Sequence, residues 1–109
     1  MVIDFNKLET ASIPEFKGGI GNTIAQMHVD PMNRIMVGRL EPGCSIGMHT
    51  HDTSSEIIYV LSGTATWLYD DTVETGTPGS CHYCPKGHAH STVNNGTEDL
   101  VFFAVVPQQ

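Results

Sequence analysis

The sequence predicts an all-β protein, either a barrel or a sandwich. Short runs of apolar or alternating residues follow one another along the chain, as in strands that bury at least one face. Turn-forming residues separate these runs at regular intervals, and no stretch shows an amphipathic helical stripe with capping residues. The 109 residues are expected to form one domain.

Eight runs are expected to be strands, because they are rich in β-branched and aromatic residues or alternate between apolar and polar residues. In chain order they are IAQMHV (24–29), RIMVGRL (34–40), SIGMHTH (45–51), EIIYVLSG (56–63), TATWLYD (64–70), SCHYC (80–84), HSTVN (90–94) and LVFFAVV (100–106). Residues 1–23 are mixed in composition, with a glycine-rich loop at 17–21. We expect this N-terminal segment to pack on the barrel or on a dimer partner.

The turns between these strands have recognisable chemistry. Pro42-Gly43 and Pro78-Gly79 each supply the fixed φ and the following positive φ of a type II turn. Ser62-Gly63 and the stretch 94–96 (Asn-Asn-Gly) are interpreted as hairpin turns.

Charge and cysteine content narrow the classes of function. Twelve Asp and Glu against five Lys and Arg give a formal net charge of −7, which argues against binding to nucleic acid or to anionic membranes. Three cysteines, an odd number, and no signal peptide predict a location in the reducing cytoplasm. No apolar run is long enough to span a membrane.

The histidines suggest a metal site. His49 and His51 are two positions apart, so on a strand both side chains project from one face, about 7 Å apart at the backbone. Glu56 opens the next predicted strand and could bring a carboxylate to the same point. A third imidazole could come from His88 or His90. One histidine alone is more often structural, but a glutamate and a later histidine at these positions make coincidence an unsatisfactory explanation.

Two motifs carry a family resemblance. The first, G-x5-H-x-H-x4-E-x6-G, spans 43–63 and is supplied by Gly43, His49, His51, Glu56 and Gly63. The second, G-x5-P-x-G-x2-H-x3-N, spans 79–94 and is supplied by Gly79, Pro85, Gly87, His90 and Asn94. Both resemble the signature motifs of the cupin superfamily, with no position missing. The fifteen residues between them are similar to the short spacing of small single-domain bacterial cupins.

The resemblance implies a double-stranded β-helix, or jelly-roll barrel, with a metal ion inside. By position it implies His49, His51, Glu56 and His90 as ligands. Three neutral imidazoles and a carboxylate suit a divalent transition metal, Mn, Fe, Co, Ni or Zn. Four protein ligands would leave one or two positions for water or substrate.

The strand SCHYC offers further candidates. Cys81 and Cys84 are three positions apart, so on a strand they point to opposite faces and are poorly placed to share a zinc ion. They are more simply read as small hydrophobic residues, although Cys81 remains a candidate for the pocket wall. Either His82 or Tyr83 should face inward, His82 as a candidate general base or Tyr83 as a hydrogen-bonding group; alternation alone leaves the choice open.

Three other side chains are candidates for the substrate pocket. An inward Arg39 would favour a carboxylate-bearing substrate, although an exposed arginine at a sheet edge is an equally good interpretation. Trp67 and Tyr69 share a face and could form a pocket wall or part of the core. LVFFAVV is apolar on both faces, which predicts that both are covered. The resemblance implies a homodimer interface there.

These observations leave several classes of function. The first is a metal-dependent enzyme acting on a small polar molecule, by dioxygenation, isomerisation, decarboxylation, hydrolysis or a lyase reaction. The second is a non-catalytic binding or sensor module with a structural metal. A metal-independent sugar epimerase is weaker, because five Lys and Arg are few for a nucleotide phosphate.

Overall fold

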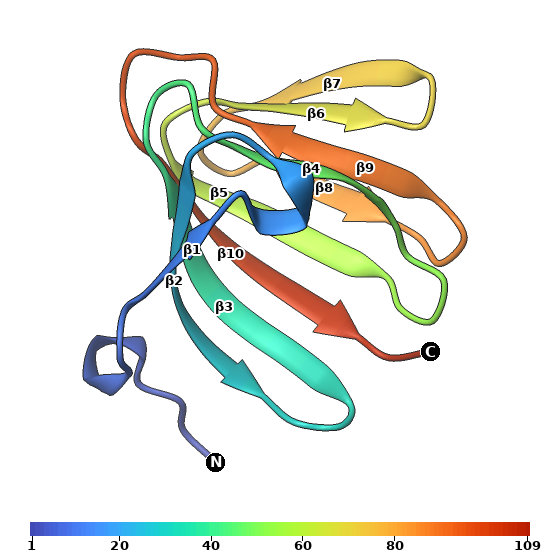
Figure 1. Ribbon diagram of the computed structural model, residues 1–109. Helices are drawn as coiled ribbons and strands as arrows, with labels where there is room; N and C mark the ends of the chain where they lie inside the picture. The colour runs from blue at the N-terminus through green and yellow to red at the C-terminus, as the bar shows by residue number, and fades with distance from the viewer.

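Ten β-strands form two antiparallel sheets that face each other (Figure 1). The computed structural model describes residues 1–109. The strands are β1 (Ala11–Pro14), β2 (Asn22–Val29), β3 (Asn33–Leu40), β4 (Ser45–Thr50), β5 (Glu56–Ser62), β6 (Ala65–Tyr69), β7 (Thr72–Gly76), β8 (Cys81–Cys84), β9 (Ala89–Val93) and β10 (Leu100–Pro107). Two single-turn 3-10 helices, η1 (Phe5–Lys7) and η2 (Phe16–Gly18), precede β1 and β2. Neither is long enough to cross a membrane.

The chain passes repeatedly from one sheet to the other. The six-stranded sheet has the order β1-β2-β3-β10-β5-β8 and the four-stranded sheet has the order β4-β9-β6-β7. From β3 onward, only β6 and β7 follow each other within one sheet. This alternation is the double-stranded β-helix, so the predicted fold class is confirmed.

All eight predicted runs form strands, and two further strands were not predicted. β1 is short, ends in a proline and pairs only with β2. β7, of sequence TVETG, is exposed along most of its length. Neither strand contributes a row of buried side chains, so neither has the apolar pattern on which the prediction depends.

The turns agree with the predictions in part. Gly43 and Gly79 have φ of 85° and 96°, and each turn is closed by the expected backbone bond, Cys44 N to Glu41 O and Ser80 N to Thr77 O. The two predicted hairpin turns are wrong. Ser62-Gly63 carries the chain from β5 to β6, and 94–96 carries it from β9 to β10, in each case into the other sheet. Turn residues fix where the chain bends, but they do not choose the sheet that the next strand joins.

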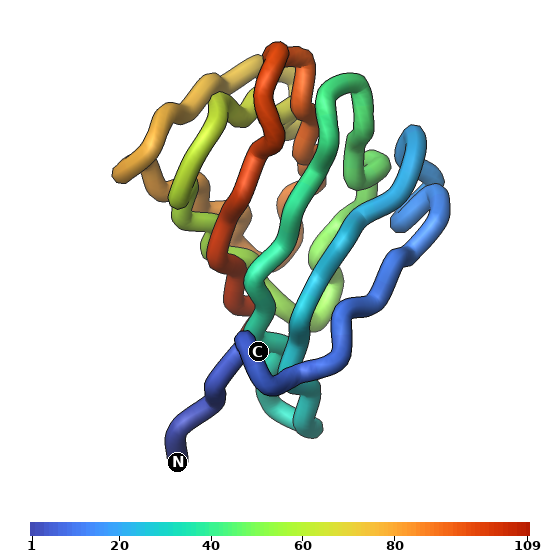
Figure 2. The backbone as a smooth tube through the Cα atoms, turned by 90° about the vertical axis from the view of Figure 1, so that its left-hand side faces the viewer, coloured from blue at the N-terminus to red at the C-terminus, as the bar shows by residue number.

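The core lies between the two sheets. Along β10, inward Leu100, Phe102 and Ala104 are fully buried, and Leu100 and Ala104 are register partners of Leu40 and Met36 on β3. The outer face of β10 is only half-buried. Figure 2 shows the N-terminal segment running along this side of the six-stranded sheet, where Phe5 packs edge-on against Phe103 with ring centroids 6.1 Å apart.

Candidate metal centre and the adjoining pocket

Four side chains converge at one end of the barrel interior. His49 lies near the end of β4, His51 just after it, Glu56 at the start of β5 and His90 in β9. Antiparallel pairing of β4 with β9 places His49 opposite His90. One potential ligand atom from each of the four residues lies within 4.8 Å of the others. The four residues implied by the resemblance are therefore brought together by the fold.

The converging atoms are three imidazole nitrogens and one carboxylate oxygen. Glu56 Oε1 lies 2.9 Å from His90 Nε2, 3.3 Å from His51 Nε2 and 3.9 Å from His49 Nε2. The Nε2 atoms of His51 and His90 are 3.0 Å apart. Burial alone would raise the pKa of Glu56, but the three surrounding imidazoles lower this pKa well below its usual value. Glu56 is therefore a carboxylate at neutral pH.

The outer nitrogens of the imidazoles have partners of their own. His49 Nδ1–H donates to the carbonyl oxygen of Gly47 at 2.8 Å, so a neutral His49 presents a bare Nε2 to the cluster. His51 Nδ1 shares a 2.8 Å hydrogen bond with Ser54 Oγ, and His90 Nδ1 lies 3.0 Å from His82 Nε2. All three rings therefore point Nε2 inward.

This donor set fits a metal ion. His49 Nε2 is buried and has no hydrogen-bond partner, which is costly for a polar atom unless something else binds it. Three inward imidazole nitrogens beside one carboxylate form a set that divalent first-row transition metals favour. These four residues, named the metal cluster, could together hold one metal ion.

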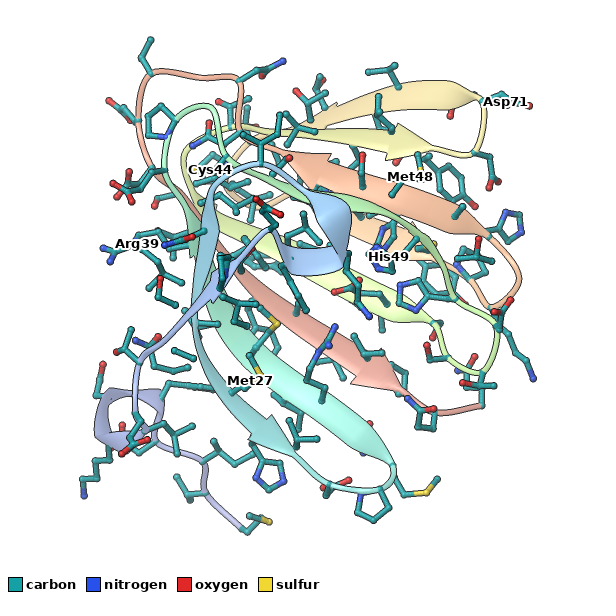
Figure 3. The ribbon with its side chains drawn as sticks, viewed as in Figure 1. Met27, Arg39, Cys44, Met48, His49 and Asp71 are labelled. Atoms are coloured by element: carbon teal, nitrogen blue, oxygen red, sulfur yellow. The ribbon has the colours of Figure 1, made fainter.

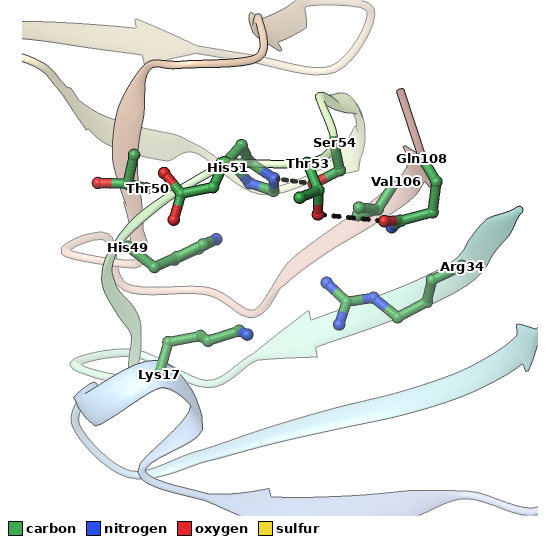
Figure 4. A pocket seen from close by; sticks show the side chains of 10 residues that line it. Lys17, Arg34, His49, Thr50, His51, Thr53, Ser54, Val106 and Gln108 are labelled. Carbon is green, nitrogen blue, oxygen red and sulfur yellow. Dashed lines mark hydrogen bonds between the residues drawn. The ribbon is translucent and has the colours of Figure 1, made fainter. Parts of the chain in front are cut away.

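A pocket of about 280 Å³ opens beside the cluster (Figure 4). His49 and His51 form part of its wall, so it gives access to the metal site from solvent. Only one lining residue is apolar; the ten are Lys17, Arg34, His49, Thr50, His51, Asp52, Thr53, Ser54, Val106 and Gln108. The volume lies just below the usual range for drug-sized ligands, so the pocket suits a small polar molecule.

Two cationic side chains, Lys17 and Arg34, point into this pocket (Figure 4). Both pack against the Phe16 ring, with Lys17 Nζ 5.6 Å and Arg34 Cζ 5.5 Å from its centroid. Neither forms an ion pair with a carboxylate, and Arg34 Nε is buried without a hydrogen-bond partner. The pocket therefore offers positive charge that the protein leaves unpaired.

Lys17 reaches the pocket because the segment around η2 lies directly on β4. A side chain at Gly47 would place its Cβ 2.1 Å from the carbonyl oxygen of Lys17, so only glycine permits this approach. Ser45 and Ile20 exchange two hydrogen bonds beside it, at 2.8 and 3.0 Å. Lys17 itself has φ of 56°, a left-handed conformation that is uncommon for a residue other than glycine.

Arg34 was not among the residues predicted for the pocket, whereas Arg39 was. Arg39 lies on the outer face of β3, where its side chain is 49% exposed and its Nε is 4.0 Å from Asp99 Oδ2; Figure 3 shows it directed away from His49. Arg39 is thus not a wall of this pocket. Alternation along β3 was the available signal: Arg34 shares its parity with Met36 and Leu40, which are buried.

The structure settles which face of β8 is inward. His82 and Cys84 are buried, whereas Cys81 and Tyr83 are exposed. Tyr83 and Cys81 therefore do not face the metal cluster, contrary to their consideration as pocket residues. The two cysteines do lie on opposite faces, so they cannot share one metal ion.

His82 occupies a packed position behind His90, outside the pocket. Its ring stacks on Trp67 with centroids 4.6 Å apart. The Tyr69 ring packs against it edge to face, with centroids 5.6 Å apart. Burial lowers the pKa of His82, although the hydrogen bond that it donates to Glu74 opposes this shift, so His82 is a neutral imidazole. Trp67, Tyr69 and His82 are inward, but none of them lines the pocket. They support the metal cluster from behind.

Comparisons with known proteins agree with this architecture. The family model described as a cupin domain matches residues 36–106. An oxalate-binding protein of Thermotoga maritima is 34% identical over 68 residues, which cover 62% of this chain and 56% of that protein. The aligned part therefore spans little more than half of that relative's length.

Solved structures give the same result. The crystal structure of a predicted oxalate decarboxylase from Thermotoga maritima is similar over 100% of both chains, with a TM-score of 0.92 and 26% identity. An RmlC-like cupin from Shewanella frigidimarina matches with a TM-score of 0.79 and 16% identity over 95% of this chain and 86% of that one, a likeness of fold alone. With both motifs intact, the jelly-roll topology observed and the family model covering more than half of the sequence, this chain belongs to the cupin family.

Proposed function

We propose that this cupin binds a divalent transition metal ion (Mn, Fe, Co, Ni or Zn) through His49, His51, Glu56 and His90. We further propose that it binds a small chelating carboxylate at that metal, with oxalate as the first candidate. The bound metal would supply Lewis-acid attraction for the carboxylate oxygens of the ligand. The residues of the chain supply the remaining recognition.

The observation that carries this proposal is the pair of unpaired cations beside the metal cluster. The chain has five Lys and Arg and a net charge of −7, yet two of the five line this one pocket. The guanidinium of Arg34 can donate hydrogen bonds to both oxygens of a carboxylate from its planar fork, and Lys17 adds a second positive charge. A neutral ligand would gain little from either group.

The relatives support the choice of oxalate. One is named an oxalate-binding protein, and the structure that matches along its whole length is described as a predicted oxalate decarboxylase. Oxalate is small enough for a pocket of about 280 Å³, and its two carboxylates could meet the metal and a cation together.

The test is calorimetric titration of oxalate into the metal-loaded protein and its Arg34→Gln and Lys17→Met variants. A hydrogen bond to a charged group contributes about 1.5–3 kcal/mol, so each change should weaken oxalate binding by about 10–100-fold. Arg39→Gln, which removes the same charge from the outer face, is the matched control and should bind as the wild type does. Equal affinity in Arg34→Gln and Arg39→Gln would refute the proposed anion site.

Decarboxylation of the bound carboxylate is a second candidate, favoured by the full-length structural match to a predicted oxalate decarboxylase. Lys17 and Asp52 both line the pocket and are the residues that could exchange a proton with the ligand. Incubation of the metal-loaded protein with oxalate, followed by assay of formate and carbon dioxide, separates turnover from binding. Recovery of the bound oxalate unchanged would rule out decarboxylation and support binding as the function.

We also propose that a second copy of the chain covers the outer face of the six-stranded sheet. Ile57, Tyr59, Leu61 and Tyr83 are between 41% and 54% exposed there. β5 pairs with both β8 and β10, so this uncharged patch is continuous with the apolar outer face of β10. A two-fold related copy could bury it against itself.

Sedimentation of the wild type and of Tyr59→Glu would test this dimer. The charge should shift the protein to monomer, whereas Val73→Glu, which places the same charge at an exposed position of β7, should not. A wild type that stays monomeric at high concentration would contradict the proposal.

A further inference from the structure

Two residues behind the metal cluster, His82 and Glu74, form a hydrogen-bonded chain that ends on His90. We propose that they are positioning residues, which hold the proton of His90 on Nδ1 and leave Nε2 free to bind the metal. This inference rests on the proposed metal site, and it assigns a role to side chains outside the four-residue cluster.

The chain runs from the cluster to the surface in three short contacts. Glu56 Oε1 is 2.9 Å from His90 Nε2, His90 Nδ1 is 3.0 Å from His82 Nε2, and His82 Nδ1 is 2.8 Å from Glu74 Oε1. The His82 side chain has no exposed surface, whereas the Glu74 side chain is 47% exposed. Every nitrogen of the two rings therefore has a specific neighbour.

The direction of the hydrogen bonds follows from the chemistry of the end group. A carboxylate only accepts, so His82 Nδ1 must carry the proton that it donates to Glu74. A neutral imidazole has one such proton, which leaves His82 Nε2 as an acceptor. When a metal ion binds His90 Nε2, His90 Nδ1–H donates to His82 Nε2; without a metal, Glu56 Oε1 at 2.9 Å is a second acceptor for the same ring. Glu74 and His82 thus supply the acceptor that favours the metal-binding Nδ1–H form of His90.

Packing holds the chain in this geometry. The His82 ring lies between Trp67, stacked at 4.6 Å, and His90, stacked at 5.2 Å. It cannot rotate without breaking both stacks and both hydrogen bonds. The other two imidazoles of the cluster bond instead to a backbone carbonyl and a hydroxyl. Of the three imidazoles, only His90 is connected through its outer nitrogen to an anion, Glu74. Such a connection raises the basicity of a ligating imidazole.

The experiment combines a tautomer measurement with metal titrations of the full chain. Long-range nitrogen–proton NMR on the metal-free protein at neutral pH identifies which ring nitrogen of His82 and His90 is protonated. Mn²⁺ and Co²⁺ affinities are then measured for the wild type and three variants. His82→Phe keeps an aromatic ring on Trp67 but removes both nitrogens. Glu74→Gln keeps the acceptor oxygen but removes the charge. Asp71→Asn, an exposed change in the same β6–β7 hairpin, is the control.

We expect protonation at Nδ1 of His82 in the metal-free wild type, because this nitrogen faces the Glu74 carboxylate. Loss of an outer hydrogen-bond partner typically weakens metal binding by about 10–100-fold. His82→Phe should show this loss, because His90 Nδ1–H then has no acceptor. Glu74→Gln should keep the tautomer and lose about tenfold in affinity, at the lower end of that range. Asp71→Asn should bind as the wild type does.

Two results would overturn the inference: a proton on Nε2 of His82 in the metal-free wild type, or equal metal affinity in Glu74→Gln and Asp71→Asn. The comparison of Glu74→Gln with Asp71→Asn still tests the inference if His82→Phe does not fold, because Glu74 is half exposed and its replacement leaves the core intact. A wild type that binds neither metal would refute the proposed metal site instead, while the NMR spectrum would still test the tautomer assignment.

Discussion

The two ends of the barrel interior are built from the inner faces of the same strands, yet they differ in kind. On β3 the inward residues change from Leu40 at one end to Arg34 at the other, and on β4 they change from Ile46 to His49. The first end is buried and mainly apolar around Leu40 and Leu100, with Thr23 and Asn94 as the buried polar side chains beside Leu40. The second holds the metal cluster and opens into the polar pocket.

This contrast separates the part of the interior that stabilises the fold from the part that binds. Burial of apolar side chains at the first end lowers the free energy of the folded state. Burial of Glu56 and three imidazoles at the second end is unfavourable unless they are paired or bound to a metal. Polar residues that cost stability in a small barrel are therefore best explained by their function.

The sharpest way to test the contrast is to remove ligands from the polar end. His49→Ala, Glu56→Ala and His90→Ala should each lose metal binding by more than about 100-fold, because loss of even an outer partner costs about 10–100-fold. Elemental analysis of the purified proteins measures this directly. Wild-type metal content in all three variants would show that the cluster is not the site.

The complementary change is made at the apolar end. Phe102 is fully buried, and Phe102→Ala should lower the free energy of unfolding by about 3–5 kcal/mol through lost burial and the cavity left behind. Denaturant unfolding of the metal-free protein measures the loss. Metal at 100 times its dissociation constant should then stabilise this variant by about 2.7 kcal/mol, as it does the wild type. A variant that also lost its metal would show that the two ends are not independent.

A smaller effect is expected where the segment around η2 contacts β4. Gly47→Ala would place a methyl group against the carbonyl of Lys17, and this overpacking should cost about 1–3 kcal/mol. The segment must move away, so oxalate affinity should fall while metal content stays unchanged. Gly43→Ala, where an added Cβ meets nothing within 4 Å, reports the cost of replacing a positive-φ glycine in a turn. Equal oxalate affinity in Gly47→Ala and the wild type would place Lys17 outside the binding site.

The smallest effect concerns the thiols of β8. Burial raises the pKa of Cys84 to about 11, so at pH 8 it is a protonated and unreactive thiol. Cys81 is exposed on the other face of the strand. Iodoacetamide at pH 8 should therefore modify Cys81 and spare Cys84, which mass spectrometry of the peptides can show. Rapid modification of Cys84 would indicate that this end of the barrel opens in solution.

The sequence predicts most strands because their alternation follows from burial of one face. Burial alternates from Met36 to Leu40 in β3 and along the whole of β10, although the β10 sequence is apolar on both faces. Exposed β7 shows no such pattern. The four residues of the metal cluster could be predicted because their spacing is a family motif. Whether Arg34 or Arg39 enters the pocket depends on strand parity, which places Arg34 on the same face as buried Met36 and Leu40.

Contacts between distant segments could not be predicted in this way. Lys17 reaches the pocket only because η2 packs on β4, and Glu74 meets His82 only because β7 and β8 lie in facing sheets. Neither contact leaves a periodic signal or a motif. The predicted hairpin at Ser62-Gly63 is wrong for the same reason, because the sheet that the next strand joins is determined by the whole fold.

The position of Lys17 and Arg34, the two cationic residues of the pocket, has a consequence for how proteins of this kind diverge. The family model covers residues 36–106, which include all four residues of the metal cluster, whereas Lys17 and Arg34 lie N-terminal to it. A relative that shares only the matched segment would therefore keep the four residues of the metal cluster without the two cations proposed to bind the ligand. Changes at the N-terminal edge could redirect such a protein to a new small molecule while its metal chemistry is preserved.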